Sequence, residues 1–316
     1  MALTLAQAAV LSENDLQRGV IETFVIESSV LDRIPLMAIE GNAYAYNVEA
    51  TLPGVAFRSV NEAYVESTGT FVQRSESLSI LGGDADVDRF IVQTRGNLND
   101  QRALQTRAKV KAAAYKYQDT FINGDIVVDP KGFDGLRKRL AGAQVLVAGV
   151  NGAPVVGNGA SDTMAFFDSL DALFGAVAGG PDVAYANRQV IARILSAGRR
   201  LGGATLVAND ITGKREVQWN GVAVLDIGNK ADGTPIIPQT ETTGTAAGTT
   251  SSIYAVKFGQ DEGDQAVTGL TNGGVQVYDL GEVSDKPVFR TRLEFYCGLA
   301  TFGGNSAARL TGVLNA

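Results

Sequence analysis

The sequence has no histidine and a single cysteine, Cys297, among its 316 residues. Histidine is the commonest general base and a usual zinc ligand, so its absence excludes Ser-His and Cys-His nucleophile pairs and argues against hydrolase chemistry. One cysteine excludes an intramolecular disulfide and any multi-cysteine metal site, and Cys297 is predicted to be a core residue. We therefore expect no catalytic residues, no cofactor and no metal site.

Long apolar runs are also absent. No segment approaches the roughly 18 apolar residues of a membrane-spanning helix. The amino terminus, MALTLAQAAVLSENDLQRG, has neither the basic start nor the cleavage site of a signal peptide. The chain is expected to be made in the cytoplasm, without membrane contact. Its 45% hydrophobic content is ample for one large domain or two ordinary ones with a real core.

The formal net charge of -7 is unevenly distributed. Residues 99–140 hold 9 basic and 5 acidic side chains, whereas residues 1–98 hold 6 and 13. The basic segment could contact nucleic acid, or it could be a solvated helix face paired with a neighbouring acidic surface. The second interpretation is favoured, because an acidic chain is a poor sequence-specific DNA binder.

The clearest element is a long helix over Asn99 to Ile122, which contains neither glycine nor proline. Asp100 suits the positive end of a helix, and Asn123-Gly124 predicts a left-handed stop. A narrow apolar stripe runs along it, formed by Ala103, Val110, Ala114, Tyr117 and Phe121. Such a helix can lie as a spine against one sheet.

Before this helix, the spacing over Leu3 to Ser29 predicts one or two amphipathic helices. Tyr44, Tyr46 and Val48 alternate as in a half-buried strand. From Val55 to Ser79 the chain is polar and predicts an extended two-stranded arm, which is marginally stable alone and normally rests on another subunit. Leu78 to Thr94 predicts a long strand or strand pair.

The carboxylates of Asp84, Asp86 and Asp88 lie at alternate positions, as at the start of a calcium loop. Arg89 stands where that loop requires glycine, so a solvated strand face is the preferred interpretation. A paired-carboxylate acid/base site stays open, although nothing marks one pair among the 34 acidic residues. The Gly157–Gly159 fragment completes no phosphate-loop motif and predicts a turn.

Residues 141–256 predict a compact α/β unit. It contains a helix over Ser161 to Gly179 capped by Ser161, a buried strand over Pro181 to Ala186, a helix over Arg188 to Leu201 and a type I′ hairpin at Asn220-Gly221. Thr240 to Ser252 is predicted to be a flexible surface loop. A turn is predicted at Asn272 to Gly274. Val288 to Phe302 alternates strongly and predicts a strand that joins the sheet of Leu78 to Thr94.

The order of these parts resembles that of the major capsid proteins of tailed bacteriophages, which have the Hong Kong 97 fold. The resemblance covers nearly the whole chain. It rests on the order of the elements and on several sequence segments, because no short motif defines the family. Its characteristic phrases are FINGD at Phe121 to Asp125, GFDGL at Gly132 to Leu136, GPDVAYANRQVIARI at Gly180 to Ile194, and the carboxy-terminal stretch Pro287 to Val313.

The resemblance implies an α+β fold with four parts. These are an N-terminal arm (1–40), an extended loop (41–79), a peripheral domain (80–140 and 257–316) with a spine helix (99–122), and an axial domain (141–256). The implied function is structural: a major capsid protein that self-assembles into hexamers and pentamers of an icosahedral head around double-stranded DNA. The protein would then lie in the virion, and in the host cytoplasm during assembly.

The resemblance also implies partners. These are further copies of the chain, a scaffolding protein, a portal protein and a decoration protein, with non-specific contact to packaged DNA. Some family members crosslink neighbours through an extended-loop lysine, but this chain has no lysine before Lys109, so we expect a non-covalent shell. Because the arm begins almost at Met1, without a long scaffolding segment, the scaffolding protein is expected to be separate.

Two alternatives remain open from the sequence. The first shares the fold and is an encapsulin-type compartment shell, which encloses cargo enzymes instead of a genome. The second is a soluble α/β enzyme that uses carboxylates or a bound metal, works without histidine and forms a small oligomer.

Overall fold

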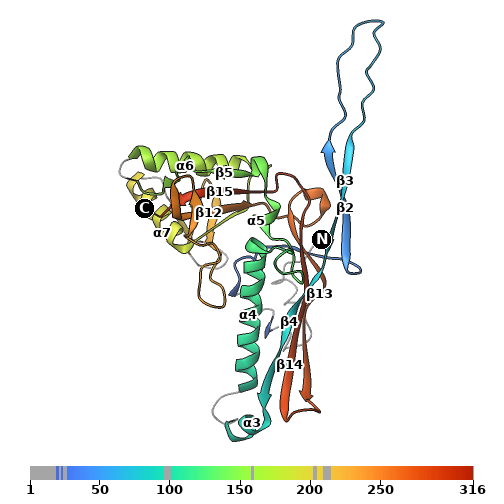
Figure 1. The fold of residues 1–316 in the computed structure, drawn as a ribbon, viewed down its shortest axis with the longest axis vertical. Coiled ribbons are helices and arrows are strands. Elements are labelled where there is room, and N and C mark those ends of the chain that lie inside the picture. The colour runs from blue at the N-terminus through green and yellow to red at the C-terminus, as the bar shows by residue number, and fades with distance from the viewer. Residues whose placement is uncertain are drawn as a thin grey trace.

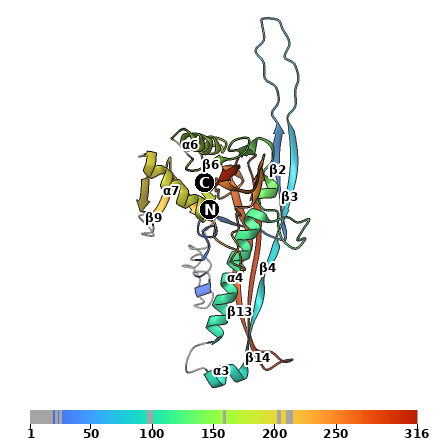
Figure 2. The same cartoon turned by 60° about the vertical axis from the view of Figure 1, so that its left-hand side comes forward.

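The computed structural model describes residues 19–20, 23, 27–95, 101–157, 160–201, 205–208 and 215–315. Most of the predicted helical stretch Leu3 to Ser29 lies outside these residues. The described strands form a four-stranded sheet, a nine-stranded sheet and a two-stranded hairpin that projects beyond the body (Figure 1). A view turned by 60° shows the same projection (Figure 2).

The four-stranded sheet has the order β1-β13-β14-β4. β14 is antiparallel to both neighbours, and β1 is parallel to β13. Along β14 the side chains of Leu293, Phe295 and Cys297 are buried on one face, as the alternation predicted, and β14 pairs with β4, also as predicted. The strands are β1 (Leu36–Ala38), β4 (Ser79–Asp88), β13 (Val267–Glu282) and β14 (Val288–Thr301).

The long helix α4 (Gln101–Asn123) confirms the predicted spine within two residues at each end. Its 23 residues span roughly 35 Å, alongside the long strands (Figure 1). Most of the predicted stripe is buried, and the Tyr117 ring lies 5.8 Å from that of Phe295 on β14. Ala103 is exposed, and Thr106 is the buried residue nearest that end.

The predicted left-handed stop after α4 is wrong, because Gly124 does not have a positive φ. A Cβ at Gly124 would lie 2.3 Å from the carbonyl oxygen of Phe133. The glycine therefore permits a close approach of the returning chain, which continues into α5 (Leu136–Arg139).

The strand predicted over Leu78 to Thr94 is shorter in the structure. β4 ends at Asp88, and α3 (Arg89–Arg95) follows directly. The Asp88 carboxylate accepts a hydrogen bond from the N–H of Phe90 at 2.7 Å, which satisfies a free donor of the first helical turn. This cap ends the strand six residues before the apolar pattern does.

The nine-stranded sheet has the path β5-β15-β12-β7-β10-β9-β8, with β6 paired to β15 and β11 to β12. The four residues of β7 are all buried. One face of the sheet packs against α6 and α7, and the other packs against the end of α4, where Phe121 meets Tyr185 at 6.1 Å. The strands are β5 (Val145–Val147), β6 (Ala153–Pro154), β7 (Val183–Ala186), β8 (Thr205–Ala208), β9 (Arg215–Trp219), β10 (Val222–Asp226), β11 (Glu241–Thr243), β12 (Ala246–Val256) and β15 (Ala307–Leu314).

Two predictions in this unit are confirmed closely. α7 (Arg188–Leu201) has the predicted bounds. The β9–β10 hairpin turns at Asn220 and Gly221, whose φ values of 49° and 80° are those of a type I′ turn. The 3₁₀ turns at Gly142–Gln144 and Glu262–Asp264 complete the elements.

α6 (Ala160–Gly175) differs in detail from the prediction. The helix already includes Ala160, so Ser161 is not its cap, and it ends four residues before Gly179. On this helix Phe166 is fully buried, whereas Met164 is exposed.

The flexible loop predicted over Thr240 to Ser252 is wrong. This stretch forms β11 and the first part of β12, and Thr250, Ser251 and Ser252 are fully buried. The Thr250 hydroxyl donates to the Glu241 carbonyl at 2.8 Å and the Ser252 hydroxyl to the Glu241 carboxylate, so hydrogen bonds satisfy these two polar groups, which composition alone assigns to solvent.

The turn predicted at Asn272 to Gly274 is also wrong. β13 continues through it, and its register against β14 shifts between Thr271 and Val275. Gly273 and Gly274 have φ values of 78° and 67°, so the glycines form a bulge within one strand.

Candidate assembly interface

The hairpin formed by β2 (Ala43–Thr51) and β3 (Thr70–Ser77) is joined to the body at its foot by aromatic packing. The Tyr46 ring meets Phe302 edge-on at 4.9 Å, and its hydroxyl donates to the Thr301 carbonyl at 3.3 Å. Burial raises the pKa of Tyr46. The predicted alternation of Tyr44, Tyr46 and Val48 is therefore confirmed, because their common side faces a small core.

An ion pair also fixes the foot. The guanidinium of Arg139 on α5 donates to both carboxylate oxygens of Glu76 on β3, at 2.5 and 2.7 Å. Only 11% of the Arg139 side chain and 18% of the Glu76 side chain are exposed. A bidentate pair of this kind adds directional control to the charge attraction. The hairpin thus leaves the body at a defined angle.

The tip of the hairpin, residues 52–69, has almost no contact with the rest of the chain (Figures 1 and 2). Local contacts shape it: the Glu62 N–H donates to Ser59 O at 3.2 Å, and Arg58 lies over the Tyr64 ring at 5.0 Å. Its large apolar side chains are exposed: Leu52, Val55, Phe57, Val60, Tyr64 and Val65. Val55 is 96% exposed, so the tip presents apolar surface that this chain alone does not cover.

The outward face of β4 and β14 carries a charge ladder, which we define as Asp84, Asp86, Arg290 and Arg292. Arg292 donates to both oxygens of Asp84 at 2.8 and 3.0 Å. Arg290 donates to both oxygens of Asp86 at 2.7 and 2.6 Å. Each pair is directly opposite in the strand register. Hydrogen bonds from these arginines lower the pKa of both carboxyls.

The ladder bears on the calcium-loop question raised by the sequence. Asp84 and Asp86 lie on the outward face, as predicted, with Ala85 and Val87 buried between them. Their carboxylates are engaged by arginines, so the alternating acids serve cross-strand pairing. Within the described ranges, no three His, Cys, Asp or Glu side chains come together as a candidate metal site.

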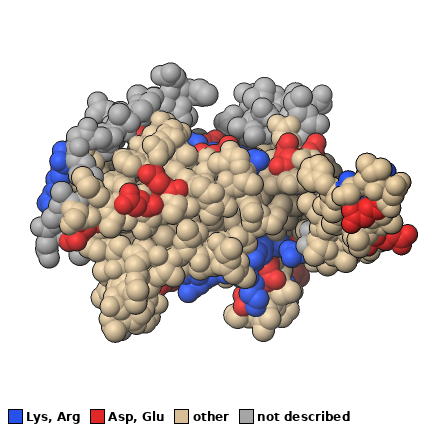
Figure 3. All heavy atoms as spheres, turned by 90° about the horizontal axis from the view of Figure 1, so that it is seen from above, with Lys and Arg blue, Asp and Glu red and all other residues tan. Residues whose placement is uncertain are grey.

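The basic segment of residues 99–140 is largely paired with acidic side chains. Lys111 meets Glu27 at 3.1 Å and Lys138 meets Asp125 at 3.0 Å. Lys116–Asp129, Arg102–Asp279 and Arg139–Glu76 are further pairs. In the view from above, lysine and arginine side chains form small separate groups, and most of the visible surface is uncharged (Figure 3). The interpretation as a paired, solvated face is confirmed for these residues.

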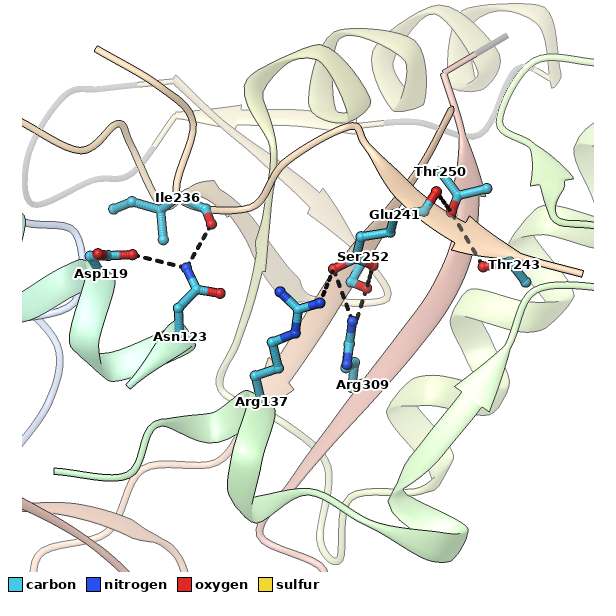
Figure 4. Close-up of polar contacts among 9 residues, drawn as sticks. All are labelled: Asp119, Asn123, Arg137, Ile236, Glu241, Thr243, Thr250, Ser252 and Arg309. Atoms are coloured by element: carbon cyan, nitrogen blue, oxygen red, sulfur yellow. Dashed lines mark hydrogen bonds and ion pairs between the residues drawn. The ribbon is translucent and has the colours of Figure 1, made fainter. Parts of the chain in front are cut away.

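A polar network joins α5 to the nine-stranded sheet (Figure 4). Arg309 on β15 donates to Glu241 at 2.9 Å and to the Ser252 hydroxyl at 3.1 Å, and Arg137 lies 3.7 Å from Glu241. Nearby, Asn123 at the end of α4 donates to the Ile236 carbonyl at 2.8 Å. The sequence does not predict this network, because its members are up to 186 positions apart. The one local signal is the spacing of two in Glu241/Thr243 and in Thr250/Ser252.

The only cysteine is a core residue, as predicted: Cys297 is buried, and burial raises the pKa of its thiol to about 12. A thiol with such a pKa is not a reactive nucleophile. None of the helices in the described part of the chain has the length and apolar character needed to cross a membrane.

Comparison with solved structures defines the fold. The chain is similar to the encapsulin complex of Synechococcus elongatus, with 20% identity, a TM-score of 0.61, and coverage of 89% of this chain and 86% of that one. It is similar to the capsid of the native GTA particle, with 16% identity, a TM-score of 0.61, and coverage of 91% and 90%. It is also similar to Mycobacterium phage Bobi, with 18% identity, a TM-score of 0.56, and coverage of 91% and 90%. The chain therefore has the fold of capsid and encapsulin shell subunits.

Residues 12–164 match the family of the major capsid protein GP7. The predicted resemblance to tailed-phage major capsid proteins and the predicted α+β fold of the Hong Kong 97 type are thereby confirmed. The match to this family agrees with the predicted major capsid function, and the encapsulin match is consistent with the first alternative. No curated protein matches the chain.

We predict that Glu76→Gln loosens the hairpin. The change leaves the largely buried Arg139 guanidinium without its carboxylate, which costs about 1–3 kcal/mol. Hydrogen exchange of the unassembled chain should become faster across residues 43–77, and the midpoint of urea denaturation should fall. Gln73→Ala, on the opposite and exposed side of the same strand, is the control and should change neither. Unchanged exchange in Glu76→Gln would show that the aromatic packing alone fixes the foot.

The charge ladder predicts a defined pH dependence. Because the folded-state pKa values of Asp84 and Asp86 are lowered, their stabilising contribution is present above the unfolded value of about 3.9 and is lost as pH falls through the folded values. The melting temperature of the double variant Asp84→Asn/Asp86→Asn should lie below that of the wild type by a constant difference from about pH 7 to 5. This difference should disappear below about pH 4. Asp168→Asn, on the exposed face of α6, is the control. A difference in melting temperature that persists below about pH 4 would contradict the assignment of this stabilisation to the ionised carboxylates of the charge ladder.

Proposed function

We propose that the protein is the major shell subunit of an icosahedral phage head, whose copies form hexamers and pentamers around double-stranded DNA and lie in the virion after assembly in the host cytoplasm. The observation that carries this proposal is the exposed apolar tip on a firmly held hairpin. Large exposed apolar surfaces mark contacts with other molecules. A hairpin fixed at its foot and bare at its tip is suited to reach a neighbouring copy.

The four-part organisation expected from the sequence is part of this proposal. The arm is 1–40, the extended loop 41–79, the peripheral domain 80–140 and 257–316, and the axial domain 141–256. The elements support this organisation, because α4 and most of the four-stranded sheet lie within residues 80–140 and 257–316, the ranges of the peripheral domain. Two strands cross the division: β1 pairs with β13, and β15 pairs with β12. These exchanges tie the parts into one subunit that can move as a unit during assembly.

Several features suit a subunit that is stabilised by contacts between chains. The charge ladder gives the four-stranded sheet an outward face that is polar and ordered. Closed rings need two different complementary patches on each copy. The hairpin tip supplies an apolar patch. The outward face of the four-stranded sheet supplies a second, polar patch. A separate scaffolding protein, a portal protein and a decoration protein are the further proposed partners.

Replacing the tip's apolar residues tests the proposal. Val55→Ser/Phe57→Ser should leave the melting temperature within about 1 °C, because both side chains are exposed in the subunit. The same variant should lose the rings or closed shells that the wild type forms. Size-exclusion chromatography with light scattering, followed by negative-stain microscopy, measures this.

The control is Val127→Ser/Val128→Ser, which removes exposed apolar side chains from the turn after α4. This control should assemble. A wild-type chain that stays a stable monomer or dimer, even with candidate scaffolding proteins added, would contradict the proposal and favour the enzyme alternative.

A non-covalent shell is a further prediction. The extended loop contains no lysine, so it lacks the amine that such a crosslink requires. Denaturing electrophoresis of mature particles should show a single band at the mass of the subunit. A ladder of covalent multimers would contradict it.

The second candidate is an encapsulin-type compartment shell, because the similarity to an encapsulin equals that to a capsid in TM-score. The contents of native particles separate the two. Nuclease-protected DNA supports the phage head, and a protein cargo without DNA supports the compartment.

A further inference from the structure

Helix α7 carries four arginines and no acidic residue. Arg188, Arg193, Arg199 and Arg200 are all exposed. This concentration is unusual in a chain with a net charge of -7. The helix packs on the nine-stranded sheet through Val190, Ile194 and Ala197, which are fully buried. The arginines therefore lie on the side that faces away from the sheet.

The helical repeat arranges these arginines in two rows. Arg188 and Arg199 are 11 positions apart, which is close to three full turns, so they lie in one row. Arg193 and Arg200 are seven positions apart, which is close to two turns, and form the second row. Between the rows lie the uncharged side chains of Gln189, Ala192 and Ser196. The outer face of α7 thus has guanidinium groups along both sides of an uncharged strip.

These arginines form no ion pair within the part of the chain that the structure describes. The contrast with the basic segment is clear, because Lys111, Lys138 and Arg139 each meet a carboxylate there. No acidic side chain among the described residues neutralises the charge on α7. Four unneutralised guanidinium groups on one helix face attract an anion that carries several charges.

Helix stability does not explain the pattern. Arg199 and Arg200 suit the negative end of the helix, but Arg188 is its first residue, where the helix dipole disfavours a cation. That end is already capped, because the Asn187 side chain accepts from the N–H of Gln189 at 2.9 Å. Arginine at position 188 therefore has a role outside the helix.

We propose that the arginine face of α7 binds the phosphate backbone of the packaged DNA. Arginine binds phosphate with two parallel hydrogen bonds, and paired rows of arginine follow a repeating anion without reading its sequence. The inference rests on the proposed function and deepens it, because it places the α6 and α7 side of the nine-stranded sheet toward the interior of the shell. It also gives an acidic subunit a localised surface for its nucleic acid.

The test measures the binding of a labelled DNA duplex to the unassembled full-length chain by fluorescence anisotropy over a range of salt. Each phosphate contact contributes about -0.9 to the slope of log affinity against log salt. Replacing all four arginines with glutamine should reduce the slope by about 3 to 4, and each row variant, Arg188→Gln/Arg199→Gln or Arg193→Gln/Arg200→Gln, by about half of that. Glutamine keeps a similar helix propensity, so α7 should stay folded.

The matched control is Lys131→Gln/Lys286→Gln, which removes two exposed cations elsewhere. Its slope should equal that of the wild type, and circular dichroism should be the same for all variants. An unchanged slope in the α7 variants, or an equal fall in the control, overturns the inference. So does a loss of shell assembly at an unchanged slope, which would make α7 a contact between copies.

The contents of native particles keep the two proposals distinguishable. If the particles hold DNA and the slope does not depend on α7, the proposed function stands and only the inference fails. If the particles hold protein cargo and no DNA, the proposed function fails, and the inference fails with it.

Discussion

The packing of α4 between two sheets is the interaction on which the rest of the structure depends. At one level of the helix, Tyr117 meets Phe295 of the four-stranded sheet, and one turn further Phe121 meets Tyr185 of the nine-stranded sheet. Both aromatic residues of the helix are fully buried. Removing a buried aromatic side chain costs about 3–5 kcal/mol, so this seam holds the two sheets in one orientation. The hairpin, α3 and α7 are attached to the two sheets that α4 holds together.

Charged side chains in this protein mainly join elements that are distant in the sequence. Glu76 with Arg139 fixes the hairpin to α5, the charge ladder joins β4 to β14, and Glu241 with Arg309 joins β11 to β15. Each of these pairs is bidentate or partly buried, which gives it more geometric control than a solvated pair. The arginines of α7 are different because their charge faces outward. The same residue type thus has a structural use in most places, and on one helix face we propose a binding use.

The described surface is organised for contact with other molecules. The polar groups described above lie in strand-to-strand pairs and at junctions between elements. Two surfaces without a partner among the described residues differ in chemistry: the tip is apolar, and the α7 face is rich in arginine. One suits a second copy of the chain, and the other suits a polyanion. This division of surfaces is what a shell subunit needs to contact both its neighbours and its contents.

The sequence by itself determined the elements whose patterns are local. The absence of helix breakers defined α4, the strict alternation defined β14, and Asn220-Gly221 defined the β9–β10 turn. Tertiary structure decided the rest, because partners far along the chain changed the outcome. The polar stretch around Ser252 is a buried strand that bonds to Arg309. Asn272 to Gly274 form a bulge because the strand pairs with β14 on both sides of them. Gly124 is a point of close approach because the returning chain at Phe133 lies against it. Local pattern decides which way a residue can face, and only the folded chain decides what it meets there.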